Sequence, residues 1–146
     1  MSDLDVRLRL HIYQALLDRG AAPTVAESAA ALGVGDEDAR GALHRLAAGR
    51  AIVLRAGTDE VLMAPPLSAV PTRFRVEAAG RSHWANCIWD ALGVAAMLQS
   101  DARIEARCGD CDETLELRVE DGRVHGDGVV HFGLPARRWW EDIVFT

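Results

Sequence analysis

Residues 83–93 of the chain read HWANCIWDALG, and this stretch decides how the second half of the protein is expected to fold. It carries a thiol at Cys87 and a carboxyl group at Asp90, and then becomes apolar. The apolar spacing predicts a buried helix over residues 84–99 that Ser82 caps, with Cys87 in its second turn. Because residues i and i+3 share a helical face, the Cys87 thiol and the Asp90 carboxyl group are expected to lie together.

Strands are expected on both sides of this helix. Alternating apolar and polar residues, interrupted by turn residues, predict strands in TRFRV (72–76), ARIEARC (102–108), TLELRVE (114–120) and VVHFG (129–133). The segment PARRWWEDIV (135–144) begins with proline at a helix-start position and predicts a helix. Residues 67–146 therefore predict a small, mostly antiparallel sheet packed on one buried helix.

The first part of the chain, residues 1–66, predicts a winged helix-turn-helix-like module. Helical spacing, capping residues and a hairpin pattern indicate three helices and two strands, at 3–19, 24–33, 36–48, 51–54 and 61–64. The proline-bearing segment APPLSAVP (64–71) is expected to be a linker between this module and the rest of the chain. The predicted fold class is therefore α+β, with a boundary near residue 66.

The charge of this module disfavours nucleic-acid binding. In a DNA-binding winged helix the third helix enters the major groove, and here it would offer Arg40, His44, Arg45 and Arg50. Residues 1–66 hold seven arginines and nine acidic residues, a net charge of −2. Since phosphate binding needs a clustered positive face, a structural role or homodimerisation is favoured, and DNA binding stays an alternative.

Composition excludes several classes for the whole chain. The net charge of −6 argues against a protein that coats nucleic acid or an anionic membrane. No apolar run approaches the roughly 20 residues of a membrane helix, and the first residues lack the features of a signal peptide. An odd cysteine count, three, predicts free thiols or metal ligands. We therefore expect a cytoplasmic protein with no membrane partner.

Cys87 and Asp90 have two readings. In the first, a soft metal displaces the thiol proton, and the carboxyl group three residues away accepts it, an arrangement suited to acid–base chemistry at a metal. In the second, Cys87 is a buried small hydrophobe and Asp90 bonds to the backbone or to Arg103. Spacing alone favours the second reading.

The stretch FRVEAAGRSHWANCIWDALGVAAMLQSDARIEARC (74–108) resembles the core of the alkylmercury lyase (organomercurial lyase) family. The features that match are a strand ending at Val76, the aromatic lead-in at Trp84, the Cys87-x-x-Asp90 spacing and the apolar helix before ARIEARC. The resemblance implies protonolysis of a carbon–mercury bond, with Cys87 as a thiolate ligand of mercury and Asp90 as ligand and proton shuttle. Mercury would be the substrate metal, and no resident cofactor is required.

The chain departs from the family in one respect. The resemblance implies a second catalytic cysteine toward the C-terminus, whereas no cysteine follows Cys111 in this sequence. We therefore expect a shortened or degenerate member, or a chain that lacks a C-terminal piece. The alternative function is a non-catalytic protein that binds a metal or another thiophilic small molecule through a thiol, including a helix-turn-helix regulator.

Other residues are candidates for the same or a second site. Cys108 and Cys111 have the spacing of half a zinc knuckle at a predicted hairpin turn, which leaves zinc or another thiophilic metal, a redox pair and an inert turn open. Trp84, Trp89 and His131 are candidates for the wall of a pocket at Cys87, with core packing as the alternative. The indoles of residues 139–140 could form a lid.

Overall fold

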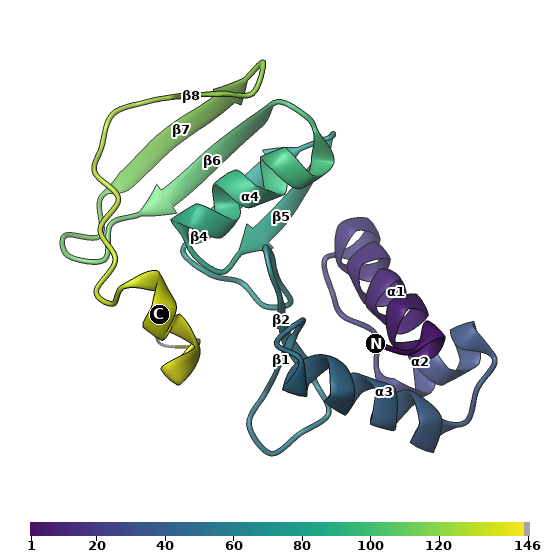
Figure 1. Ribbon diagram of the computed structural model, residues 1–146. Helices are drawn as coiled ribbons and strands as arrows, with labels where there is room; N and C mark the ends of the chain where they lie inside the picture. The colour runs from purple at the N-terminus through teal and green to yellow at the C-terminus, as the bar shows by residue number, and fades with distance from the viewer. Residues whose placement is uncertain (145–146) are drawn as a thin grey trace.

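A computed structural model describes residues 1–144 of the chain (Figure 1). The helices are α1 (Asp3–Arg19), α2 (Val25–Leu32), α3 (Asp36–Ala48), α4 (Ile88–Leu98) and the 3-10 helix η1 (Ala136–Glu141). The strands are β1 (Val53–Leu54), β2 (Val61–Ala64), β3 (Leu67–Ser68), β4 (Phe74–Ala78), β5 (Arg81–Ala85), β6 (Ala102–Arg107), β7 (Thr114–Glu120) and β8 (Arg123–His125). This mixture of helices with antiparallel strands confirms the α+β class.

Capping residues mark both ends of α1 and α2, whereas α3 has Gly35 as its N-cap, with no side-chain cap, and not Asp36 as the sequence predicted. Ser2 and Asp5 form a capping box at the start of α1, and Gly20 ends that helix with a left-handed φ of 69°. Thr24 and Glu27 form the second capping box, at the start of α2. The hairpin β1–β2 follows α3, so the element order expected for residues 1–66 is present.

All the strands belong to one antiparallel sheet in the order β1-β2-β3-β5-β4-β6-β7-β8. The segment 64–71, expected to be a linker, contains β3, whose Leu67 pairs with Ala64 on one side and Ala85 on the other. Leu67 is buried, with 1% of its surface exposed. A two-residue strand is too short to produce an alternating pattern, which is why the sequence suggested a linker.

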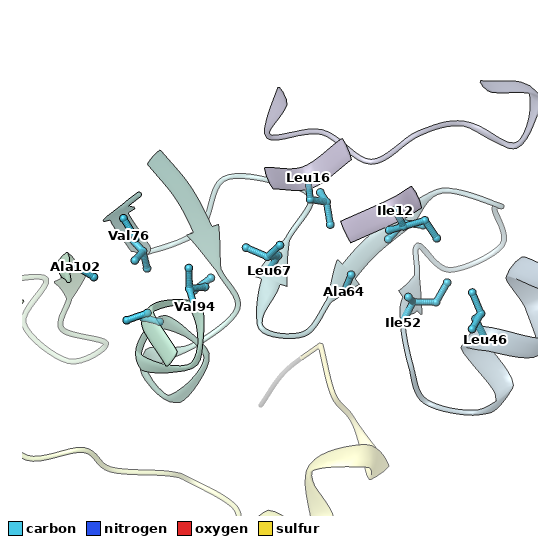
Figure 2. Packing of buried hydrophobic residues seen from close by; sticks show 14 of the residues in the cluster. Ile12, Leu16, Leu46, Ile52, Ala64, Leu67, Val76, Val94 and Ala102 are labelled. Atoms are coloured by element: carbon cyan, nitrogen blue, oxygen red, sulfur yellow. The ribbon is translucent and has the colours of Figure 1, made fainter. Parts of the chain in front are cut away.

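A continuous apolar core accompanies this sheet. Figure 2 shows Ile12 of α1 and Leu46 of α3 at one end, Leu67 in the middle, and Val94 and Val76 at the other. Helix α4 covers one face of strands β4–β6 (Figure 1). The core therefore joins the N-terminal helices to the part of the chain that carries Cys87 and Asp90.

The prediction of a helix over residues 84–99 is wrong at its start. Residues 81–85 form strand β5, which returns from β4 through a turn in which Ala79 and Gly80 both have positive φ, 50° and 74°. Two positive φ values are typical of the type I′ hairpin turn, whose twist suits paired strands. Ser82 therefore lies in a strand and does not cap α4, and Cys87 is the N-cap residue and not part of the second turn.

Two expectations for the C-terminal part are also corrected. The strand VVHFG does not form: residues 127–132 lie outside any strand, and 94% of the surface of Val129 is exposed because no strand pairs with it. The strand that pairs with β7 is β8, residues 123–125. The helix in PARRWWEDIV is the short 3-10 helix η1, which starts after Pro135.

Membrane crossing is not supported by any helix in the described part of the chain. Within residues 1–144, none of the helices combines the length and the apolar composition that a bilayer span requires.

Candidate functional site

A largely apolar cavity of about 250 Å³ lies at the N-terminal end of α4. The C-terminal segment, yellow in Figure 1, runs below the start of α4 and beside β1 and β2. The cavity is lined by residues of β2, the start of α4 and this segment: Met63, Pro65, Asn86, Cys87, Trp89, Asp90, Phe132, Trp139, Trp140, Ile143 and Val144.

The transition from β5 to α4 places the two reactive groups. Cys87 keeps the extended backbone of the strand, with φ −150° and ψ −178°, while its carbonyl oxygen accepts the first helical hydrogen bond from Ala91 N at 2.9 Å. Asp90 is then the third residue of the helix. Cys87 and Asp90 both line the cavity, so the thiol and the carboxyl group share one side of the helix start, although no capping hydrogen bond forms there. Cysteine is not a preferred N-cap residue, which suggests that helix stability did not select it.

Burial controls the protonation of Cys87. Removal from water raises the pKa of the Cys87 thiol, and the negative charge of Asp90 acts in the same direction. The backbone N–H groups of Asp90 and Trp89 oppose this shift without cancelling it. A free thiol with a raised pKa stays protonated at neutral pH, so a soft metal has to displace the proton when it binds.

Asp90 is shifted in the direction that lets a carboxyl group hold a proton. Burial raises the pKa of Asp90, and a hydrogen bond from Asn86 Nδ2 to Asp90 Oδ2, 2.8 Å long, partly offsets the rise. Asn86 Nδ2 also lies 3.4 Å from the carbonyl oxygen of Leu67 in β3. Asn86 therefore fixes the carboxyl group relative to the sheet.

The Cys87 thiol and the Asp90 carboxyl group together form a site in which a soft metal ligand lies beside a group that can accept or donate a proton. The cavity supplies a sulfur to bind a thiophilic atom and a carboxyl group to take up the displaced proton. Apolar walls suit a hydrocarbon group, and few polar groups converge on the same point, as is usual for small-molecule pockets.

Aromatic side chains form the wall opposite α4. Phe132 and Trp139 pack with ring centroids 5.0 Å apart, and Trp139 Nε1 donates to the carbonyl oxygen of Leu134 at 2.9 Å. The guanidinium of Arg50 lies 5.4 Å from the ring centroid of Trp140, at cation–π distance. The C-terminal segment is thereby held against the rest of the chain.

The residues singled out from the sequence divide into two groups. Cys87, Asp90 and Trp89 line the same cavity, with 62% of the Trp89 surface exposed. Trp84 does not line it: its strand neighbours His83 and Ala85 are buried on the α4 side, so by alternation its side chain lies on the other face of β5. His131 is exposed and also lies outside the cavity lining.

Sequence reasoning missed two lining residues of note. Asn86 precedes the cysteine and lies four residues before Asp90, a spacing typical of paired side chains at a helix start. Met63 lies in β2, far from Cys87 in the sequence, and nothing in the sequence pattern indicates that it reaches the cavity.

Cys108 and Cys111 lie at the turn between β6 and β7 and do not line this cavity. Both are free thiols, Cys108 half-buried and Cys111 exposed. In the part of the chain that the structure describes, no three His, Cys, Asp or Glu side chains gather closely enough to hold a metal ion. Zinc at this turn stays a prediction.

The basic residues of α3 are paired with acidic side chains. Arg40 Nε lies 2.8 Å from Asp59 Oδ2, and Arg45 Nη2 lies 2.7 Å from Asp5 Oδ1. His44 Nε2 lies 2.8 Å from Asp59 Oδ1. These contacts neutralise much of the positive charge that a major-groove helix would need.

Comparison with known proteins relates the chain to a protein family and to a solved structure. The family model described as MerB, alkylmercury lyase, matches residues 67–146. A solved structure described as the crystal structure of the mercury-bound form of MerB2 has a TM-score of 0.69 and 25% sequence identity, covering 86% of this chain and 60% of that one. The chain thus spans about three fifths of the length of that structure. No curated protein matches it.

Proposed function

Because the chain belongs to the alkylmercury lyase family, we propose that it cleaves carbon–mercury bonds by protonolysis, with Cys87 and Asp90 as the reacting groups. The observation that carries the proposal is that one apolar cavity holds both the Cys87 thiol and the Asp90 carboxyl group. The chain covers 60% of the similar solved structure, so the proposal rests on the residues of this chain.

In the proposed first step, an organomercurial enters between Trp89 and the aromatic wall. The Cys87 sulfur forms a bond to mercury and displaces its weaker ligand, while the thiol proton passes to the Asp90 carboxylate. Thiolates bind soft metals strongly, so mercury replaces the proton even though burial raises the pKa of this thiol.

In the proposed second step, the proton held by Asp90 is transferred to the carbon bound to mercury. A carbon–hydrogen bond forms as the carbon–mercury bond breaks, and the hydrocarbon leaves. Mercury remains divalent and bound to Cys87, so no oxidant or reductant is needed. The raised pKa of Asp90 supports this role, since a carboxyl group must be protonated part of the time to act as a general acid.

The test is a turnover assay. Reduced protein is incubated with a phenylmercury salt and an excess of a low-molecular-weight thiol, which supplies a second sulfur and removes the mercury. Release of benzene above the protein-free rate is expected. No release above that rate, with folded protein whose Cys87 is reduced, would contradict catalysis.

Two variants separate binding from proton transfer. Cys87→Ser is expected to abolish both mercury binding in the cavity and benzene release. Asp90→Asn keeps the shape and the hydrogen-bonding capacity of the side chain but cannot carry the proton, so it should bind phenylmercury and release benzene at least about 10²-fold more slowly. Quenching of tryptophan fluorescence by bound mercury reports binding, since three tryptophans line the cavity.

A second function is favoured by one observation. Among the cavity-lining residues of the described chain, Cys87 is the sole thiol. One thiol suffices to bind a thiophilic small molecule, so the second candidate is a non-catalytic binding protein. It predicts stoichiometric binding of phenylmercury in the cavity, detected by the quenching of its tryptophans and lost in Cys87→Ser, with no benzene formed by the unsubstituted protein.

For the N-terminal helices and the β1–β2 hairpin, we propose a winged-helix-like module with a structural or dimerising role. The acid partners of Arg40 and Arg45 support this over DNA binding. A molar mass near that of a single chain, measured by light scattering, would contradict a dimerising role. A salt-sensitive shift of DNA in a gel would favour the alternative of a DNA-binding regulator. The cytoplasm is the proposed location, because the proposed chemistry needs reduced thiols.

A further inference from the structure

The turn between β6 and β7 holds two cysteines in a closed backbone loop. Cys108 N donates to Glu113 O at 2.8 Å, and Asp112 N donates to Cys108 O at 3.1 Å. Asp112 is itself paired with Arg107 of β6 at 3.1 Å and with Arg73, just before β4, at 3.6 Å. The loop is thus tied to two adjacent strands.

The loop holds its two cysteines on one tight turn, because Cys108 and Cys111 are three residues apart in a segment that the hydrogen bond from Asp112 N to Cys108 O closes. Hydrogen bonding by the backbone N–H groups of Cys111 and Asp110, and then by the Cys111 side chain, lowers the pKa of Cys108. Both thiols are free, and Cys111 is exposed to solvent.

Nothing else in the described chain completes a higher-coordinate site. Residues 1–144 bring no third His, Cys, Asp or Glu side chain into a metal-binding group with these cysteines. A closed zinc site needs four ligands. Soft cations that favour linear coordination, such as Hg²⁺ or Cu⁺, are satisfied by two thiolates.

We propose that Cys108 and Cys111 together bind one linear, two-coordinate thiophilic cation, at a site separate from Cys87. Two S–H bonds break and their protons pass to solvent, two sulfur–metal bonds form, and no atom changes oxidation state. The site shares no residue with the cavity at Cys87. The proposal therefore stands whether or not the chain cleaves carbon–mercury bonds.

The register of the sheet places this loop at the same end as Cys87. Phe74 of β4 pairs with Ala85 of β5 on one side and with Ala106 of β6 on the other. Cys87 lies two residues after Ala85, and Cys108 lies two residues after Ala106. The backbones of β5 and β6 at this point are two strand spacings apart, about 10 Å, so two separate thiol sites lie at one end of the sheet.

The experiment uses the full chain with Cys87→Ser, which leaves Cys108 and Cys111 as the remaining thiols. The reduced, degassed protein is titrated with mercuric chloride in competition with glutathione. One Hg²⁺ per chain is expected, with loss of both free thiols, release of two protons and no change in hydrodynamic size.

Adding Cys111→Ser to this protein removes one sulfur at an exposed position. The affinity for Hg²⁺ is expected to fall at least about 10²-fold, because the second bond is no longer intramolecular. Glutathione should then fill the second position on mercury, and in a titration without glutathione mercury should bridge two chains and increase the hydrodynamic size. Adding Thr114→Ser instead is the control, since Thr114 is exposed at the β7 end of the same turn, and the substitution keeps both thiols and the local charge and should leave the affinity unchanged.

Three results would overturn the proposal. They are one Hg²⁺ per two chains when both cysteines are present, equal Hg²⁺ affinity with and without Cys111, and Zn²⁺ binding as tight as Hg²⁺ binding. None of them depends on benzene release, so failure of this site is distinguishable from failure of the proposed lyase reaction.

Discussion

Asn86 Nδ2 donates a hydrogen bond to Asp90 Oδ2 across 2.8 Å, from the residue that precedes the N-cap of α4 to the third residue of the helix. The bond holds the carboxyl group on the same side of the helix start as the Cys87 thiol. It also stabilises the carboxylate form, against the burial that favours the protonated form. The balance between these two effects sets when Asp90 can release its proton.

Asn86→Ala should raise the pKa of Asp90 further. The substitution removes the hydrogen bond that lowers this pKa and leaves burial unopposed. Carboxyl carbon chemical shifts recorded against pH, with Asp90→Asn used to assign the resonance, measure the change. A pKa of Asp90 that falls or stays constant would contradict the role given to Asn86.

Asp90→Asn should stabilise the fold at neutral pH. A carboxyl group whose pKa is raised on folding contributes stability below its unfolded pKa and loses that contribution as pH rises through its folded pKa. The stabilising effect of the substitution should therefore be largest at pH 7 and shrink toward pH 3. Urea unfolding at both pH values measures it, and a destabilised variant at pH 7 would show that the ionised carboxylate supports the helix.

The thiols should react with iodoacetamide in a defined order. Burial raises the pKa of Cys87, whereas backbone hydrogen bonds lower the pKa of Cys108. Because the thiolate is the reactive form, Cys108 should be alkylated at lower pH than Cys87. Mass spectrometry of peptides from samples quenched across a pH series measures both. Faster labelling of Cys87 than of Cys108 at neutral pH would contradict these opposite shifts of the two pKa values.

Asp5→Asn should remove part of the acid sensitivity of the N-terminal helices. Hydrogen bonds from Arg45 and from Ser2 lower the pKa of Asp5 from 3.8 to about 2. A lowered carboxyl pKa contributes stability above 3.8 that is lost as pH falls toward 2. The Tm of the variant should be lower than that of the unsubstituted chain at pH 7, and the difference should shrink on acidification. Asp3→Asn, at an exposed position, is the control and should change little.

Leu67→Ala should weaken the connection between the two parts of the sheet. Leu67 is 1% exposed and belongs to the strand between β2 and β5. Deleting a buried leucine side chain costs about 2–5 kcal/mol. Since one core runs through both parts, urea unfolding should remain a single transition with a lower midpoint. Two separated transitions in the unsubstituted chain would show that residues 1–66 and 67–146 unfold as separate units.

Local signals predicted much of this fold. Apolar spacing and the stop at Gly20 defined α1, and the Thr24–Glu27 capping box and Gly33 defined α2, because these signals depend on residues a few positions apart. Alternation over seven residues defined β7. The predicted start of α4 was wrong because the sequence HWA (83–85) continues into apolar residues without a break. In the structure, the hairpin turn at Ala79–Gly80 and the pairing with β4 hold residues 81–85 in an extended strand.

The candidate site was likewise predicted from the sequence only in part. The pairing of Cys87 with Asp90 followed from their spacing and survived the correction of the helix start, because both residues line the cavity. The indoles of residues 139–140 were candidates for a lid and line the cavity, but the contributions of Phe132 and Met63 could not be derived, since they depend on how the chain end packs against β2 and α4.

By itself the sequence determined the order of helices and strands in the N-terminal part, the adjacency of Cys87 and Asp90, and the resemblance that the family match confirms. These depend on contacts within a few residues, which spacing alone specifies. Tertiary structure alone decided that segment 64–71 is part of one continuous sheet, that the cavity closes against the C-terminal segment, and that Cys87 and Cys108 share an end of the sheet. Those depend on pairing and burial between residues distant in the chain, for which no local pattern exists.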